Sequence, residues 1–112
     1  VIDIDLEIDL DSIDVRFYRI LKQFEPFGPD NLNPIFSTEN LIINSPVRFI
    51  GEDKSHVKLE LNTKSAKINA IGFGIASKFK SLKKQKIDLC YTLNENYWNN
   101  KTTIQLNIKD VF

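Results

Sequence analysis

The sequence predicts one mainly β domain of five short strands, with a single helix between the third and fourth, preceded by an N-terminal strand and an amphipathic helix. Three observations support this prediction. A chain of 112 residues of which 42% are hydrophobic can bury one core. Apolar residues alternate with polar ones in most segments after residue 35, which is the period of a half-buried strand. Turn-forming residues gather at positions 28–34 and separate these strands from the N-terminal elements.

The first elements combine aliphatic residues with acids. A strand is predicted over residues 2–10, where an apolar and an acidic face alternate strictly. Ser12 is the expected N-cap of a helix that extends to Glu25 and Pro26, with Asp11 and Asp14 near its first turn. Its apolar residues recur at helical spacing: Ile13, Phe17, Ile20, Leu21 and Phe24.

The remaining elements follow in the order of a known barrel. We predict a long, interrupted strand over residues 35–50 with Pro46 at a bulge or at a sheet edge, because proline cannot donate to a sheet ladder. The later elements are strands at 56–62 and 67–73, a helix at 75–84, and strands at 87–93 and 103–111. Five strands with a helix after the third are typical of the OB fold, a Greek-key barrel. The outer face of its second and third strands, with the loops after the first and fourth, commonly binds oligonucleotides.

The formal net charge is zero, but the charge is unevenly distributed. Residues 1–30 hold eight acids and three bases, whereas residues 31–112 hold twelve bases and seven acids. The basic second part suits a polyanionic partner, although lysine-rich surfaces are also ordinary solvated faces.

Composition also bears on the setting of the chain. No apolar run approaches the roughly 18 residues of a membrane span, and no segment resembles a signal peptide, so we expect no membrane partner. The single cysteine, Cys90, cannot form a disulfide within the chain and is expected to be a buried thiol in a reducing, cytoplasmic setting. Because the chain begins at Val1 and contains no methionine, we expect a piece of a longer protein.

Residues 25–36, Glu-Pro-Phe-Gly-Pro-Asp-Asn-Leu-Asn-Pro-Ile-Phe, resemble the E-P-F-G-x-x-N-x-x-P-x-F stretch that precedes the OB domain of RecJ exonucleases. Residues 51–61 are similar to the family's G-x-D-x-x-H-x-K-L. The similarity extends over nearly the whole chain through four further segments: Ile71-Gly72-Phe73-Gly74, residues 94–98, Gln105-Leu106 and Lys109-Asp110. Asp30 and Leu32 stand where the family usually has glycine and proline, which bears on the conformation of that loop.

The resemblance implies a noncatalytic domain that binds single-stranded DNA within a 5′ to 3′ single-strand exonuclease of DNA repair and recombination. In that family the DHH and DHHA1 domains hold the metal-dependent chemistry, so the parent protein would use Mg²⁺ or Mn²⁺. Residues 1–34 would then connect the catalytic body to an OB domain at residues 35–112. The expected partners are single-stranded DNA, the catalytic domains of the same chain, and a single-strand-binding protein.

Two other classes of function compete with this interpretation. A protein-interaction module could dock on the nuclease body through residues 1–36, or on the acidic tail of a single-strand-binding protein. An independent enzyme is disfavoured, because the one histidine and the scattered acids assemble no catalytic or two-metal site. The alternating acids Asp3, Asp5, Glu7, Asp9 and Asp11 are not expected to form a calcium loop, because Ile8 and Asp14 replace the required glycine and glutamate. We expect no catalytic, cofactor or metal-binding residue in this chain.

The segment 94–101 is the first candidate binding site and is expected to be the loop between the fourth and fifth strands. It offers aromatic, amide and basic side chains: Tyr97, Trp98, Asn99 and Lys101. Nucleic-acid bases stack on exposed aromatic rings with little sequence preference, so Trp98 is expected to stack. In the alternative interpretation Trp98 folds over the end of the barrel and plugs it.

Further candidates lie around the second and third strands. If Val57, Leu59 and Leu61 point inward, His56 and Lys58 point outward and border the binding face. Lys54, in the preceding loop, is a candidate phosphate contact. Phe73 is a stacking platform if Gly72 points inward, and a core residue if a bulge reverses the facing. The lysines of the helix and its exit form either a solvated face or a track for the strand: Lys78, Lys80, Lys83, Lys84 and Lys86.

Overall fold

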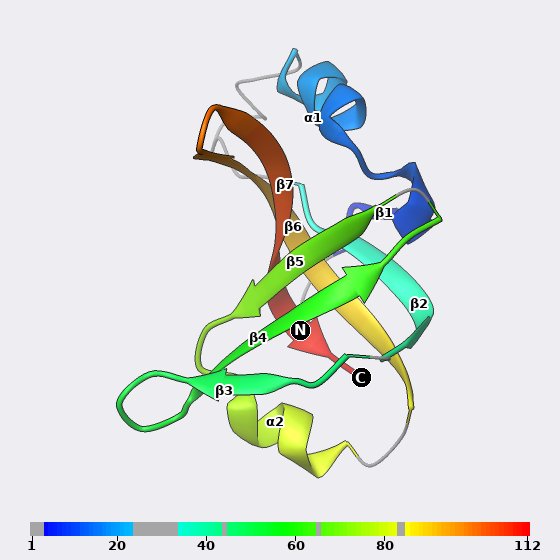
Figure 1. Ribbon diagram of the computed structural model, residues 1–112. Coiled ribbons are helices and arrows are strands. Elements are labelled where there is room, and N and C mark those ends of the chain that lie inside the picture. Colours follow the sequence, from blue (N-terminus) through cyan, green and yellow to red (C-terminus); the bar gives the residue numbers. More distant parts are fainter. Residues whose placement is uncertain (1–3, 24–33, 44, 65, 83–84) are drawn as a thin grey trace, which may run out of the picture.

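The computed structural model describes residues 4–23, 34–43, 45–64, 66–82 and 85–112, and seven strands in this part form one sheet (Figure 1). The order of the strands is β1-β2-β6-β7-β5-β4-β3. The elements are β1 (Leu6–Glu7), η1 (Leu10–Ser12), α1 (Val15–Lys22), β2 (Phe36–Ile42), β3 (Arg48–Ile50), β4 (His56–Asn62), β5 (Lys67–Gly72), α2 (Ala76–Ser81), β6 (Lys86–Trp98) and β7 (Lys101–Val111).

The sheet curls because two consecutive strands lie far apart in its order. β2 pairs antiparallel with β6, whereas β3 pairs antiparallel with β4 at the opposite end of the sheet. Only residues 43–47 join them, so the two ends of the sheet must approach each other. The predicted long, interrupted strand over 35–50 is thus two separate strands, and Pro46 lies between them instead of at a bulge or edge within a strand. With β5 and β7 paired in parallel, the arrangement is that of an OB barrel, and the predicted mainly β fold class is confirmed.

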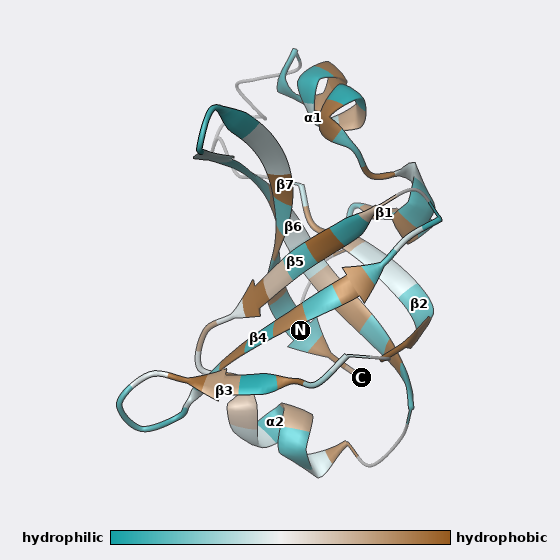
Figure 2. Ribbon diagram, in the orientation of Figure 1, coloured by the Kyte–Doolittle hydropathy of each residue, from teal (hydrophilic) through white to brown (hydrophobic). Residues whose placement is uncertain are grey.

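Alternation along the strands fills the interior of the barrel. Val57, Leu59 and Leu61 of β4 are buried, as their spacing predicts, and hydrophobic and hydrophilic residues alternate along β4 in Figure 2. Cys90 of β6 is also buried and free, which confirms the prediction of a buried thiol. Burial is the main reason that the pKa of the Cys90 thiol is raised, so little of the reactive thiolate form is present.

The helix between β5 and β6 is confirmed over a shorter range than predicted. α2 lies below β3 and β4 in Figure 1, where Ala76 and Phe79 are buried. Neither helix that the structure describes has the length and apolar composition that crossing a bilayer requires.

The N-terminal strand is much shorter than its alternating sequence predicts. β1 contains two residues, which pair in parallel with Phe36 and Ser37, and its Leu6 is 50% exposed. The acids account for the difference, because they accept backbone hydrogen bonds instead of forming one face of a strand. Asp5 Oδ2 accepts from the N–H of Ile35 at 2.7 Å, and Asp9 Oδ1 accepts from the N–H of Asp11 at 3.0 Å as the N-cap of η1. Such side-chain to backbone bonds compete with a regular ladder. Residues 1–3 lie outside the described part of the chain.

The cap of α1 also differs from the prediction. Asp14, not Ser12, is the N-cap, because Asp14 Oδ1 accepts from the N–H of Phe17 at 2.7 Å. Ser12 is the last residue of η1, whose own N-cap is Asp9. The predicted end of the helix at Glu25 and Pro26 lies outside the described residues.

We therefore expect Asp14→Ala to lower the free energy of unfolding by about 0.5–2 kcal/mol, which is the usual cost of a lost N-cap. Ser12→Ala is the matched control and should stay within about 0.5 kcal/mol of wild type. Urea unfolding of both variants measures the difference. A larger loss for the Ser12 variant than for the Asp14 variant would contradict the assignment of the cap.

Candidate nucleic-acid interface

One surface of the barrel, which we call the outer face, is formed by the outward-pointing residues of β3, β4, β5 and β7. Their order follows from the strand register: Arg48 lies opposite Lys58, Lys58 opposite Ile71, and Ile71 opposite Asn107. A second row contains Glu60, Asn69 and Gln105. The face therefore carries two adjacent bases and three amides, which are side chains that can donate hydrogen bonds to phosphates and bases.

The segment after Asn94 is not a loop. β6 and β7 stay paired until Trp98 lies opposite Lys101, so residues 94–105 form a two-stranded arm. Asn99 and Asn100 make the turn with φ angles of 56° and 62°, a left-handed conformation that asparagine tolerates and that two-residue hairpin turns require. The predicted loop is thus wrong in its length. Both faces of the arm are exposed near its tip, so no apolar alternation reveals the strands in the sequence.

Trp98 and Tyr97 project from opposite faces of this arm, because successive side chains of a strand alternate. Trp98 is 78% exposed and shares its face with Lys101, Thr103 and Gln105, so it continues the outer face. Tyr97 has the parity of the buried Leu93, is 68% exposed, and donates a hydrogen bond from its hydroxyl to Asn100 Oδ1 at 3.1 Å. The interpretation of Trp98 as a barrel plug is therefore wrong.

The loop between β3 and β4 is joined to the end of β5 through His56. His56 Nδ1 accepts a hydrogen bond from the N–H of Gly74 at 2.9 Å. The His56 and Phe73 rings meet in a T-shaped arrangement, with centroids 5.3 Å apart and planes at 71°. Phe73 is 59% exposed, so its alternative assignment to the core is wrong. On the other side of His56, Gly51 has φ +99°, and a Cβ there would lie 2.9 Å from His56 Cδ2.

The same loop presents Lys54 to solvent. Lys54 is exposed and has a φ angle of 60°. Its backbone N–H donates to the carbonyl of Gly51 at 3.1 Å, which closes the turn. Ser55 donates to the Asp53 carboxylate, and this bonding is the main reason that the pKa of Asp53 is lowered. Asp53 therefore remains a charged acceptor that fixes the turn beside Lys54.

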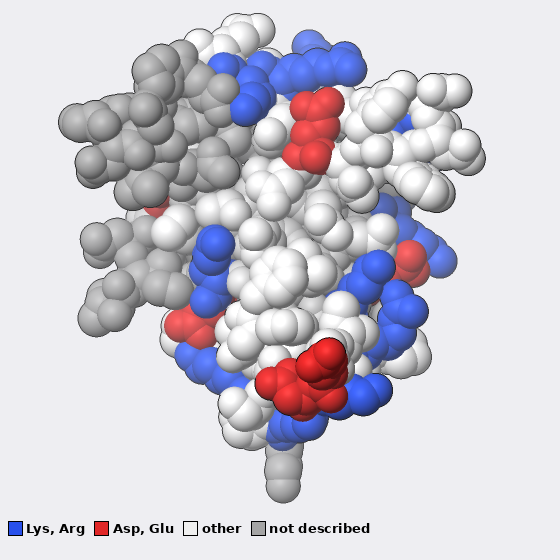
Figure 3. Space-filling model, turned by 90° about the vertical axis from the view of Figure 1, so that its left-hand side faces the viewer, with Lys and Arg blue, Asp and Glu red and all other residues white. Residues whose placement is uncertain are grey.

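The predicted site residues fall into two groups. One group lies at the loop between β3 and β4, which we call the loop end: Lys54, His56 and Phe73. The other lies at the tip of the arm: Trp98, Asn99 and Lys101. Lys58 lies on the outer face of β4, whereas Tyr97 lies on the opposite side of the arm. The loop and the arm both project to the left in Figure 1. Figure 3 views the molecule from that side and shows basic side chains on several sides of a central area without charge.

Several residues of the outer face escape sequence reasoning. Arg48, Asn69, Gln105 and Asn107 are separated by long stretches of sequence, and only the register brings them into adjacent positions. The available signal was alternation with buried neighbours on the same strand: Leu106 and Ile108 beside Gln105 and Asn107, and Ile68 and Ala70 beside Asn69. Among the helix lysines, Lys78 pairs with Asp110 and lies 4.4 Å from the centroid of the Phe112 ring, and Lys80 lies 4.7 Å from that of Phe49.

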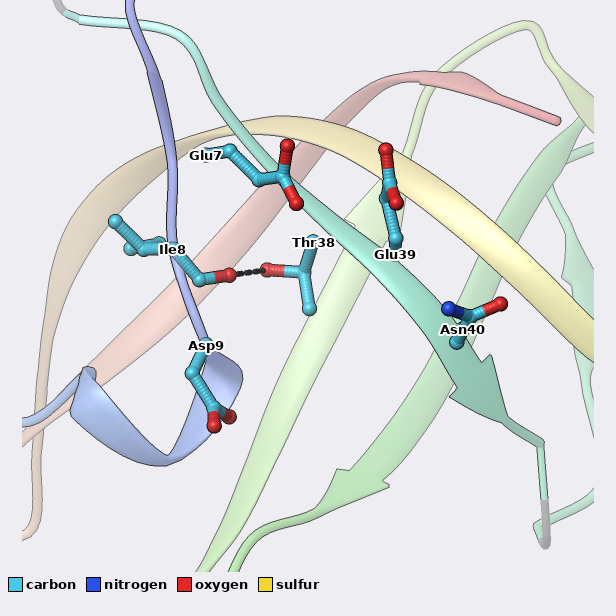
Figure 4. A pocket seen from close by; sticks show the side chains of 6 residues that line it. All are labelled: Glu7, Ile8, Asp9, Thr38, Glu39 and Asn40. Carbon is cyan, nitrogen blue, oxygen red and sulfur yellow. Dashed lines mark hydrogen bonds between the residues drawn. The ribbon is translucent and has the colours of Figure 1, made fainter.

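A hollow of about 380 Å³ lies away from the outer face, between the N-terminal segment and β2 (Figure 4). Three of its lining residues are acids, Glu7, Asp9 and Glu39, which would repel a polyanion. Thr38 Oγ1 donates to the carbonyl of Ile8 at 2.9 Å beside this hollow. In the described part of the chain, no three His, Cys, Asp or Glu side chains are grouped so that they could hold a metal ion.

Comparisons with known proteins agree with the barrel. The sequence pattern of the family described as "RecJ OB domain" matches residues 4–110. The single-stranded-DNA-specific exonuclease RecJ of Bacillus subtilis (strain 168) is 30% identical over 109 residues, which are 96% of this chain and 14% of that protein. This chain therefore spans about one seventh of the length of that relative.

Solved structures support the same fold. RecJ from Thermus thermophilus, in complex with Mn²⁺, aligns with a TM-score of 0.62 at 20% identity and covers 87% of this chain and 13% of its own. The second single-stranded DNA-binding protein (SSBb) of Mycobacterium smegmatis aligns with a TM-score of 0.51 at 19% identity, over 70% of this chain and 82% of its own. Since the family pattern covers nearly all of the sequence, this chain belongs to the RecJ OB domain family.

Proposed function

We propose that this chain is a noncatalytic domain that binds single-stranded DNA and holds it for a metal-dependent 5′ to 3′ exonuclease. The observation that carries the proposal is the exposed indole of Trp98, which lies on the same face as Lys101 at the tip of the arm. The names of two relatives point the same way, since one is a single-stranded-DNA-specific exonuclease and the other a single-stranded DNA-binding protein.

In this proposal the single-stranded DNA follows the outer face from the arm to the loop between β3 and β4. Trp98 stacks on a base at the arm and Phe73 on another near the loop, and each stacked base contributes about 1–3 kcal/mol. Lys101, Lys58 and Lys54 neutralise phosphates, while Asn99 and the amides between the two ends donate hydrogen bonds. His56 positions Phe73 through their ring contact. Tyr97 has no place on this path, because it projects from the other face of the arm.

The rest of the parent protein supplies the chemistry. The catalytic domains, with Mg²⁺ or Mn²⁺ as their metal, would lie outside this chain, and the parent enzyme would work in the cytoplasm. RecJ of Thermus thermophilus has been solved with each of these two ions. Residues 1–34 would connect those domains to the barrel at residues 35–112. Four acids near the N-terminus either accept hydrogen bonds from the backbone of the barrel region or cap helices, which gives this segment a structural role: Asp5, Asp9, Asp11 and Asp14.

A second candidate function is the docking of a protein partner, either the catalytic domains or a single-strand-binding protein. The observation that favours it is β1, which ends the sheet and has no partner on its outer edge among the strands that the structure describes. Ile4 and Leu6 beside this edge are 48% and 50% exposed. Exposed aliphatic residues at an open strand edge are typical of surfaces that another protein covers.

Binding of fluorescently labelled oligo-dT to the purified chain tests the first proposal against the second. We expect saturable binding that weakens with salt, with a log–log slope of about 0.7 per phosphate neutralised. An acidic-tail peptide serves as the competing ligand. Binding of the peptide without binding of oligo-dT would favour the protein-docking function. With Mg²⁺ or Mn²⁺ present, the oligonucleotide should stay intact.

A further inference from the structure

Arg48 and Lys58 are like charges that lie directly opposite each other in the antiparallel pair β3–β4. Residues in such positions have β-carbons about 4.5–5.5 Å apart, and like charges there destabilise the sheet. Arg48 is exposed and Lys58 is half-buried, so solvent only partly screens their repulsion.

No acid that the structure describes forms an ion pair with either base. Glu60 is the next outward-pointing residue of β4, but its carboxylate lies 3.5 Å from Nζ of Lys67, on β5. The other ion pair between described residues joins Lys78 to Asp110. The two bases therefore have no ion-pair partner within this part of the chain.

A hollow of about 250 Å³ lies beside the two bases, at the edge of the outer face. Its lining residues are Ser45, Pro46, Arg48, Lys58, Leu59, Glu60 and Asn69. Ser45 and Asn69 add neutral hydrogen-bond donors to the two cations. A guanidinium can donate two parallel hydrogen bonds to one phosphate, and an ammonium binds it as a point charge.

We propose that Arg48 and Lys58 together hold one backbone phosphate of the bound single strand. This subsite rests on the proposed function and extends the DNA path from the arm across β7, β5 and β4 to β3. The phosphate replaces the repulsion between the two cations with attraction to both. The unfavourable pair is thus a stability cost of the free domain that the bound strand removes.

Two substitutions of equal charge change test the subsite: Arg48→Gln and Lys58→Gln. Each should lower oligo-dT affinity about threefold to tenfold, and should reduce the log–log salt slope by less than the roughly 0.7 of one phosphate contact, because the remaining cation still binds the same phosphate. Because each also removes the repulsion, the unfolding midpoint without DNA should stay the same or rise. Arg48→Lys keeps the positive charge but loses the two parallel hydrogen bonds of the guanidinium. It should retain the wild-type salt slope and lose less affinity than Arg48→Gln.

Arg19→Gln is the matched control. Arg19 is an exposed base in the last turn of α1, a helix that lies on the far side of the molecule from β3 in Figure 1. Because Arg19 is remote from β3 and β4, the same loss of charge there should change the affinity and the salt slope less than either β3–β4 variant does. It should slightly lower the unfolding midpoint, because a cation near the C-terminus of a helix is favourable.

The outcomes separate the subsite from the proposed function. If wild type binds oligo-dT and both β3–β4 variants keep its affinity and salt slope, the subsite is wrong and the proposed function stands. If either variant unfolds at a clearly lower temperature than wild type, the pair is structural and the subsite is also overturned. If wild type does not bind oligo-dT, both proposals fail. If Arg48→Gln lowers binding of the acidic-tail peptide only, the pair recognises a protein carboxylate instead of DNA.

Discussion

Trp98→Ala is expected to weaken binding of oligo-dT by about 1–3 kcal/mol, the value for one lost stacking contact, which is a loss in affinity of about 5- to 150-fold. The melting temperature should change little, because the side chain is 78% exposed and contributes almost nothing to the core. A buried tryptophan would instead cost about 3–5 kcal/mol of stability. Fluorescence anisotropy of the labelled strand and thermal unfolding measure the two quantities.

The chain offers a matched control at the adjacent residue. Tyr97→Ala removes another exposed ring from the same strand, but from the opposite face of the arm. We expect its effect on affinity to be much smaller than that of Trp98→Ala. An equal loss for both variants would show that the DNA wraps around the tip of the arm, and would contradict a DNA path restricted to the outer face.

The intrinsic fluorescence of the chain gives an independent measurement. Trp98 is the single tryptophan in the sequence, so quenching reports one position. Oligo-dT should quench it as a base stacks on the indole. Binding that leaves the fluorescence unchanged would remove Trp98 from the interface.

Raising the pH from about 10 to about 12 is expected to remove on the order of 2–3 kcal/mol of folding stability through Tyr91. Burial is the main reason that the pKa of Tyr91 is raised to about 12, and its side chain is fully buried in the barrel. The folded state therefore holds its proton more tightly than the unfolded state, in which a tyrosine has a pKa of about 10. The stabilisation is fully present below pH 10 and is lost as the pH rises through 12.

The hydrogen bonds around Tyr91 show what its ionisation would disturb. Thr38 Oγ1 lies 2.7 Å from the hydroxyl oxygen of Tyr91 and donates its own proton to the carbonyl of Ile8 at 2.9 Å. Tyr91 must then be the donor to Thr38. This chain of bonds connects β6 to β2 and β2 to the N-terminal segment. Loss of the Tyr91 proton at high pH would leave a buried anion at its start.

Tyr91→Phe separates this residue from the lysines, which also titrate near pH 10. The variant should lose about 1 kcal/mol at neutral pH with the hydrogen bond, and should lose less further stability than wild type between pH 10 and 12. Tyr97→Phe removes an exposed hydroxyl and should follow the wild-type profile. Urea unfolding at each pH measures these free energies. Parallel profiles for wild type and Tyr91→Phe would contradict the role of Tyr91.

The sequence by itself determined most of the barrel. β4 and β5 alternate apolar and polar residues because one face of each is buried, so their strands, and the inward direction of Val57, Leu59 and Leu61, were predictable. The buried thiol of Cys90 and the helix between β5 and β6 followed from the same hydrophobic pattern. The motif at residues 25–36 indicated the family, although most of those residues lie outside the described part of the chain.

Only the tertiary structure decided the features that long-range contacts create. The alternating N-terminal segment is mostly not a strand, because Asp5 bonds to the backbone of Ile35, which is distant in sequence, and Asp9 caps the short helix η1. The arm has two exposed faces near its tip, and without a buried face the hydrophobic period carries no information about strands. The opposition of Arg48 and Lys58 depends on the register of β3 and β4 across the intervening loop. A strand's own residues specify which side chains share its face, but only its partner specifies which charges meet.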